Sequence, residues 1–205
     1  MKYPLRLKKS DKKWDRQLHI NTMGLYDKQE DDDHFRYEPT PYEVLARLKR
    51  SGYISSHSRV LDYGCGKGRV CFFLSDQVRC QTKGVDFSQE MIEAAEANKL
   101  HFDKKEYVRF ACEYAEKTEI TDEDAFFFFN PFSYDILKPV LARIIASWYA
   151  HPRDVKLFFY YPSPAYLVTL FTTGEMRFVD EIDCQDLFAQ SDDRERVVIF
   201  EIGVE

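Results

Sequence analysis

Five short runs of strand-forming residues alternate with segments in which apolar side chains recur at helical spacing. One of these runs, Ala125–Phe129, is apolar throughout, which is typical of a strand buried on both faces of a parallel sheet. Strands joined by helices favour parallel pairing with crossover connections. The predicted strands are Arg59–Tyr63, Gln81–Val85, Val108–Cys112, Ala125–Phe129 and Val155–Tyr161.

The pattern changes after Gly174. Met176–Ile182 and Val197–Ile202 are predicted as strands, and only the polar loop Asp183–Arg196 separates them. This loop is too short for a crossover helix, so the two strands should pair antiparallel. The predicted fold class is therefore α/β: a doubly wound, seven-stranded, mostly parallel sheet with an antiparallel C-terminal strand pair and helices on both faces.

Capping residues mark where the predicted helices begin. Ser88 can cap one helix, and Ser163 followed by Pro164 can open another. Pro139 is predicted to stand in the first turn of the helix that carries Val140 and Ile144.

Residues 1–36 show no sustained period but hold scattered apolar side chains, among them Trp14, Leu18 and Phe35. We predict two parts: residues 1–36 as an N-terminal extension or lid that folds over the open edge of the sheet, and residues 37–205 as the α/β domain.

Composition and charge narrow the class of protein. The chain of 205 residues is 44% hydrophobic and 16% aromatic, as expected of one globular domain. Its net charge is −6, but residues 1–16 carry +5. This basic arm could contact nucleic-acid phosphates, whereas the acidic remainder would repel them, so a nucleic-acid partner is not supported.

Neither a membrane segment nor a metal site is indicated. No apolar stretch approaches the roughly 20 residues that a membrane-spanning helix needs. The amino terminus lacks an apolar signal core, and the five cysteines form no C-x-x-C pair. These features predict reduced thiols, no bound metal and a cytoplasmic protein.

The strongest candidate for chemistry is the glycine-rich string from Val60 to Gly68, VLDYGCGKG, between the first predicted strand and helix. Open α/β sheets bind ligands at this edge, where glycines allow the backbone to approach the ligand closely. Asp86 follows the second strand, 22 residues after Gly64, where a carboxylate can accept hydrogen bonds from ribose hydroxyls. Arg69 occupies the last position of the dinucleotide fingerprint, and no P-loop string is present.

These residues, with the string GVDFSQEMIEAA after them, resemble the first two motifs of class I S-adenosylmethionine-dependent methyltransferases. The resemblance spans about residues 37–202 and implies S-adenosyl-L-methionine as cofactor. It implies that the three loop glycines surround the methionine end, that Asp62 supports the loop and the cofactor amino group, and that Asp86 holds the ribose. The remaining implied cofactor contacts are Phe87 and Glu113 at the adenine; the full set is Asp62, Gly64, Gly66, Gly68, Asp86, Phe87 and Glu113.

Two further strings resemble parts of narrower families. Tyr37-Glu38-Pro39-Thr40-Pro41 resembles a segment of lysine methyltransferases that closes over the methionine end, which implies cofactor contacts for Tyr37 and Thr40. Asn130-Pro131-Phe132 resembles the Asn-Pro-Pro-Tyr-type motif of amino-group methyltransferases, which implies that Asn130 orients the acceptor nitrogen and Phe132 packs on the acceptor. The alternatives are a turn that enters a helix and an Asn-Pro turn that ends a strand.

Three functions remain open at this point. The first is methyl transfer to a nitrogen of a protein side chain or a nucleobase. The second is methylation of a small molecule, and the third is a catalytically silent protein that keeps the cofactor fold as a binding module. The methyl acceptor could thus be a protein, an RNA or a small molecule.

Overall fold

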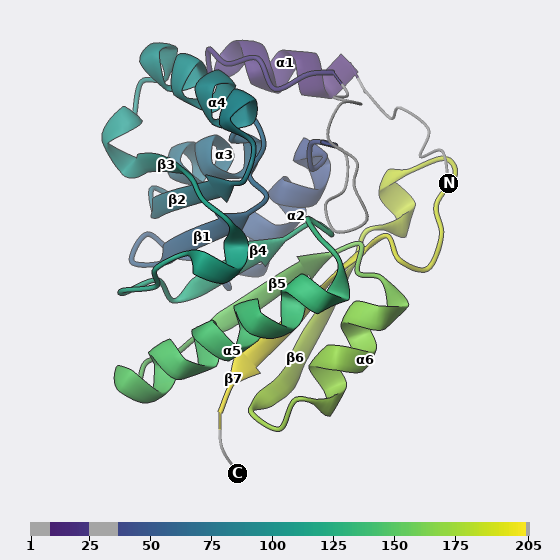
Figure 1. The fold of residues 1–205 in the computed structure, drawn as a ribbon. Helices are drawn as coiled ribbons and strands as arrows, with labels where there is room; N and C mark the ends of the chain where they lie inside the picture. Colours follow the sequence, from purple (N-terminus) through teal and green to yellow (C-terminus); the bar gives the residue numbers. More distant parts are fainter. Residues whose placement is uncertain (1–8, 25–36, 204–205) are drawn as a thin grey trace.

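The computed structural model describes residues 9–24 and 37–203. One seven-stranded sheet runs through the molecule in the order β3-β2-β1-β4-β5-β7-β6 (Figure 1). The strands from β1 to β5 pair in parallel, and β7 pairs antiparallel with both β5 and β6. The predicted fold class is confirmed. The strands are β1 Arg59–Tyr63, β2 Gln81–Asp86, β3 Val108–Cys112, β4 Ala125–Phe128, β5 Lys156–Tyr160, β6 Met176–Asp183 and β7 Arg196–Ile202.

Two helical layers cover the sheet, and alternate side chains of strand β4 pack against one layer or the other. Alternate residues of a strand point to opposite faces. Phe127 therefore packs in the cluster under α1, α2 and α3, while Phe126 and Phe128 pack in the cluster under α5 and α6. All three phenylalanines are fully buried. The helices are α1 Lys9–Gln17, α2 Tyr42–Ser51, α3 Arg69–Gln77, α4 Gln89–His101, α5 Tyr134–Ala150 and α6 Pro164–Thr172.

Helix α5 begins earlier than its proline suggested. It starts at Tyr134 after the N-cap Ser133, so Pro139 lies inside the helix and the prediction that it stands in the first turn was wrong. Leu137, which lies between Ser133 and Pro139, is fully buried in the cluster under α5 and α6. Burial of the first turns against the sheet therefore outweighs the hydrogen bond that proline removes.

The N-terminal residues that the structure describes belong to the packed body. Helix α1 packs against α2 (Figure 1), and after it Asn21 N–H donates to Asn98 Oδ1 of α4 while Leu18 and Thr22 are buried. Residues 25–36, the part of the predicted extension that leads into Tyr37, lie outside the described residues, as do residues 1–8 of the basic arm. The division at residue 36 stays a prediction.

Within the described ranges, 9–24 and 37–203, no helix is long and apolar enough to cross a membrane, and no three or more metal-ligating side chains form a group.

Candidate active site

The carboxyl ends of β1, β2 and β4 meet at one edge of the sheet, and the glycine loop lies there between β1 and α3. Gly64, Gly66 and Gly68 have φ values of 70°, 51° and 86°, in the left-handed region that side chains disfavour. A Cβ on Gly64 would lie 2.4 Å from Pro131 Cβ, and one on Gly66 would lie 2.2 Å from the Tyr37 ring. Both the conformation and the close contacts require glycine at these positions.

Asp86 clamps the loop to the end of β2. Its Oδ2 accepts a hydrogen bond from the backbone N–H of Gly66 at 2.9 Å, and its Oδ1 accepts one from that of Ser88 at 2.9 Å. The backbone N–H groups of Gly64 and Cys65 donate to Val85 O at 2.9 and 3.0 Å. A carboxylate has about four acceptor positions, so Asp86 is able to hold the loop and accept ligand hydroxyls at once.

Asp62 lies beneath this loop with only 3% of its surface exposed. Its Oδ2 accepts a hydrogen bond from the Cys71 thiol, with 3.8 Å between the two atoms. Burial, and then the charge of Asp86, raise the pKa of the Asp62 carboxyl well above its usual value. Two carboxyl groups that disfavour each other's charge provide an environment suited to a cationic ligand group.

The cysteine within the loop is not poised for nucleophilic chemistry. Cys65 is buried, and burial raises the pKa of its thiol well above the usual value. The thiolate is the reactive form of cysteine, so a covalent role for Cys65 is disfavoured.

The structure brings Tyr37 to the glycine loop but places Thr40 behind it. The Tyr37 ring lies against Gly66, and its hydroxyl donates to Thr22 O at 2.7 Å. Thr40 is buried, and its carbonyl accepts a hydrogen bond from the Arg69 guanidinium at 3.2 Å. Of the two, Tyr37 forms a wall of the loop, and Thr40 joins the buried surroundings of Arg69.

An aromatic pair stands at the ends of β2 and β3. The rings of Phe87 and Tyr114 lie 6.5 Å apart between centroids and 25° from parallel, and Tyr114 is half exposed. The sequence motif points to Phe87 but not to Tyr114, because no pattern along the chain shows that the two rings face each other. Glu113 turns toward β2, where its Oε2 lies 3.8 Å from Lys83 Nζ.

The end of β4 carries a strained residue. Asn130 has φ 38°, and its side chain bridges to the segment after β5: the amide nitrogen donates to Tyr161 O and the amide oxygen accepts from Ser163 N at 3.2 Å. Tyr161 is itself left-handed, with φ 52°. Non-glycine residues in this conformation cost of order 1–3 kcal/mol each and concentrate at functional sites.

The Phe132 ring is not exposed at this edge of the sheet. Its ring is buried with 3% exposure and makes edge-on contacts with Tyr63 and Phe128, while its carbonyl accepts from the Tyr166 hydroxyl at 2.7 Å. The side chain that the sequence placed on the acceptor thus lies in the core beneath the Asn130–Pro131 turn.

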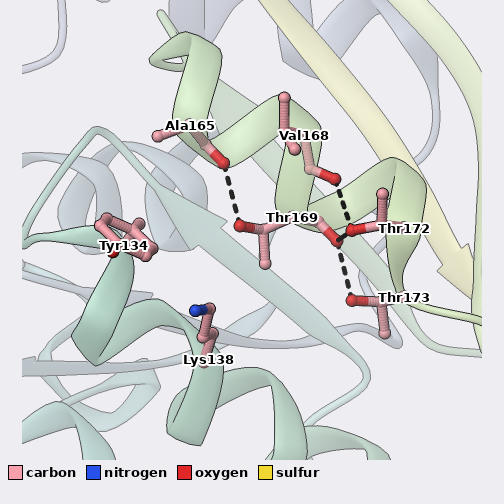
Figure 2. Close-up of a pocket in the computed structure, with 7 residues that line it drawn as sticks. All are labelled: Tyr134, Lys138, Ala165, Val168, Thr169, Thr172 and Thr173. Carbon is pink, nitrogen blue, oxygen red and sulfur yellow. Dashed lines mark hydrogen bonds between the residues drawn. The ribbon is translucent and has the colours of Figure 1, made fainter.

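A shallow groove of about 490 Å³ runs between α5 and α6 (Figure 2). Tyr134 and Lys138 of α5 face the threonines of α6 across it. The hydroxyls of these threonines donate to carbonyls of their own chain segment, so the groove shows no ligand chemistry of its own. It is lined by Tyr134, Lys138, Ala165, Val168, Thr169, Thr172 and Thr173.

Comparison with known proteins decides among the ligands that such an edge can bind. The family model described as "Methyltransferase domain" matches residues 54–144, from the turn before β1 into α5. This match, together with the fold, supports a class I S-adenosylmethionine-dependent methyltransferase. The match contains the glycine loop, Asp86, Glu113 and Asn130.

Solved structures share the fold of this methyltransferase at low sequence identity. A TehB-like SAM-dependent methyltransferase from Corynebacterium glutamicum is 21% identical, with a TM-score of 0.55 over 78% of this chain and 87% of the other. An RNA methyltransferase from Salinibacter ruber, in complex with S-adenosyl-L-homocysteine, is 15% identical, with a TM-score of 0.55 over 82% and 95%. The glycopeptide N-methyltransferase MtfA is 11% identical, with a TM-score of 0.60 over 80% and 90%. No curated protein sequence matches the chain.

The described residues fit the cofactor of this class, S-adenosyl-L-methionine. A side chain at any of the three loop glycines would collide with residues packed against the loop, so the loop keeps its conformation only with glycine. The acidic surroundings of the loop, Asp62 and Asp86, complement the positive charges of the methionine end. The backbone conformation of the loop and the acidic groups beside it therefore suit the cofactor of this class.

Proposed function

We propose that the enzyme transfers the methyl group to a nitrogen atom of a protein side chain or a nucleobase. The observation that carries this proposal is the contact between two turns. Pro131, which follows the strained Asn130, packs directly on Gly64 of the glycine loop. An acceptor held at Asn130–Pro131 would lie next to the methionine end of the cofactor, as methyl transfer requires.

The cofactor contacts form the first part of the proposal. The glycine loop surrounds the methionine end, with the Tyr37 ring as one wall. Asp86 accepts the ribose hydroxyls, and Asp62 supports the loop and the amino group from below. At the adenine we place Phe87, and we add Tyr114, because its half-exposed ring stands beside that of Phe87 at the ends of β2 and β3.

Two of the predicted cofactor contacts take more distant roles in this proposal. Glu113 stands at the outer end of the adenine region, and its backbone N–H donates to Asp86 O at 3.0 Å. This hydrogen bond fixes β3 relative to the ribose-binding carboxylate. Thr40 supports Tyr37 from behind through Arg69.

Positioning supplies most of the catalysis in this scheme. The cofactor provides a methyl group that is already activated on a sulfonium, so no strong base is needed. The backbone carbonyl of Pro131 and the Asn130 side-chain oxygen accept hydrogen bonds from the acceptor nitrogen and align its lone pair. Correct alignment of this kind can lower a barrier by roughly 7–11 kcal/mol. Phe132 holds the turn in place from the core.

Charge near the acceptor edge favours a protein over a nucleic acid. The Tyr161 hydroxyl donates to Asp192 at 2.6 Å, and that of Tyr160 donates to the buried Glu195 at 2.8 Å. The Arg194 guanidinium, 3.9 Å from the centroid of the Tyr161 ring, offsets one of these carboxylates. The net charge of −6 still disfavours a polyanion and suits a cationic protein side chain. A small-molecule acceptor remains the alternative, and a silent binding module is disfavoured because the loop and Asp86 are both intact.

Transfer from methyl-labelled S-adenosylmethionine into fractionated cell extract tests this function. We expect label in the protein fraction, recovered as N-methyl amino acid after hydrolysis, and none with heat-inactivated enzyme. Label in nucleobases would agree with methyl transfer to nitrogen but would overturn the preference for a protein acceptor. Label on oxygen, carbon or small molecules would refute the proposal, and cofactor binding without label in any fraction would favour a silent module.

The predicted cytoplasmic location stays a prediction.

A further inference from the structure

Arg69, the first residue of α3, is a guanidinium almost completely buried at 2% exposure. Its Nε donates to Thr22 Oγ1 at 2.7 Å, and one terminal nitrogen donates to Thr40 O at 3.2 Å. The guanidinium also lies 4.5 Å from the centroid of the Tyr42 ring. It directly follows Gly68, so whatever holds Arg69 also holds the end of the glycine loop.

The partners of this guanidinium come mainly from the N-terminal segment 9–24. Its nitrogens lie 3.5 Å from an oxygen of Asp11 and 3.9 Å from one of Asp15. Asp15 in turn accepts from Thr22 N at 2.7 Å, from Thr22 Oγ1 at 2.8 Å and from the Tyr42 hydroxyl at 2.6 Å. Buried charges need such partners, and removing one partner leaves the other uncompensated. Segment 9–24 is therefore fastened to the start of α3.

The same segment also contacts the glycine loop at the residues that precede Gly68. Met23 O accepts a hydrogen bond from Lys67 Nζ at 2.9 Å. The side-chain amide of Asn98 donates to Lys67 O at 3.1 Å and to Asn21 O at 3.2 Å, and thereby links the loop to the segment. Thr22 O accepts from the hydroxyl of Tyr37, whose ring lies on Gly66. Positions 66–69 are thus fixed to residues 21–23 directly or through one intermediate side chain.

We propose that segment 9–24 is a positioning element of the cofactor site, with Arg69 and Thr22 as its positioning residues. A loop with three glycines loses more conformational entropy on ordering than other sequences do. The segment orders this loop in advance, so the cofactor does not meet that cost on binding. This role differs from that of a lid, because Leu18 and Thr22 of the segment are buried in the packed body of the domain. The inference rests on the proposed contact between the glycine loop and the cofactor.

Calorimetric titration with S-adenosylhomocysteine, paired with thermal unfolding, tests the proposal. Thr22→Val keeps the shape of the side chain but removes the hydroxyl that joins Arg69 to Asp15. Arg69→Lys keeps the charge but loses the planar set of donors. Ser75→Ala is the matched control: it removes a buried hydroxyl from the same helix, one that hydrogen-bonds near Cys80 and Thr82, away from the loop.

We expect the dissociation constant to rise at least tenfold in Thr22→Val and Arg69→Lys, and to stay within twofold in Ser75→Ala at a similar loss of melting temperature. An equal change of affinity in all three variants, or no change in Thr22→Val and Arg69→Lys, would overturn the positioning role. Wild-type protein that binds no S-adenosylhomocysteine would instead refute the cofactor site itself. If Arg69→Lys fails to fold, Thr22→Val decides the question.

Discussion

Replacement of Asp62 by asparagine should make the free protein more stable and its cofactor complex weaker. Asp62 is buried at 3% exposure, and its carboxyl accepts from the Cys71 thiol at 3.8 Å. A thiol is a weak donor, and the neighbouring Asp86 adds repulsion. The asparagine side chain has the same shape but carries no charge, so Asp62→Asn removes the penalty for a poorly compensated buried carboxylate.

The magnitude follows from the cost of a poorly satisfied buried group, about 1–3 kcal/mol. For a chain of this length, 1 kcal/mol corresponds to about 2–4 °C in melting temperature. We therefore expect Asp62→Asn to melt a few degrees above the wild type at neutral pH.

The pH dependence has a definite sign. Because the folded protein raises the pKa of Asp62 above its usual 3.8, the folded state binds the proton more tightly than the unfolded state. The buried carboxylate therefore lowers the wild type's free energy of unfolding in full above the pKa of the folded state. This loss of stability disappears as the pH falls to the pKa of the unfolded state. The advantage of Asp62→Asn should shrink on acidification.

Binding should change in the opposite direction. If the Asp62 carboxyl supports the amino group of the ligand, its loss removes a charge-assisted interaction of about 1.5–3 kcal/mol. This corresponds to about a 10- to 100-fold weaker affinity for S-adenosylhomocysteine. Thermal unfolding at several pH values and calorimetric titration measure the two effects. A variant that melts below the wild type at neutral pH, with unchanged affinity, would refute the reasoning.

Three further substitutions separate the roles of the site. Asp86→Ala should weaken S-adenosylhomocysteine binding by about 10- to 100-fold in calorimetry, because the ribose contacts are lost; unchanged affinity would remove Asp86 from the site. Asn130→Gly, which tolerates the φ of 38°, should cut methyl transfer to the labelled fraction by about 100-fold with cofactor affinity within twofold; a parallel loss of affinity would make Asn130 a cofactor residue. Phe132→Ala should lower the free energy of unfolding by about 3–5 kcal/mol, measured by denaturant titration, because the ring is 3% exposed in the core; a stable variant with impaired turnover alone would return Phe132 to the acceptor.

The sheet and the glycine loop could be predicted because their signals are local. Strand β4 is a continuous apolar run bounded by Asn130, and the loop at Gly64 combines glycine spacing with flanking strand and helix patterns. Helix α1 could not be predicted in the same way. Its inward side carries Asp11 and Asp15, which interrupt the hydrophobic period. The guanidinium that pairs with both of them, that of Arg69, lies more than fifty positions further along the chain.

The parts of the site that escaped prediction depend on contacts between distant strands. Tyr114 gains a role only when β3 lies beside β2 and brings its ring opposite Phe87. The string Asn130-Pro131-Phe132 reads the same whether the Phe132 ring is exposed to an acceptor or buried. Its place in the cluster under α5 and α6 shows that the ring points into the core. Asn130 and Thr40 likewise reveal their hydrogen-bond partners only in the folded chain.

Calorimetric titration of the wild-type protein with S-adenosylhomocysteine tests the central claim most directly. The account predicts saturable binding of one ligand per chain, with a dissociation constant that Asp86→Ala increases. A nicotinamide dinucleotide should give no heat of binding in the same cell, because Arg69 occupies the position where its fingerprint requires glycine or alanine. Binding of the dinucleotide, with no heat from S-adenosylhomocysteine, would contradict the account.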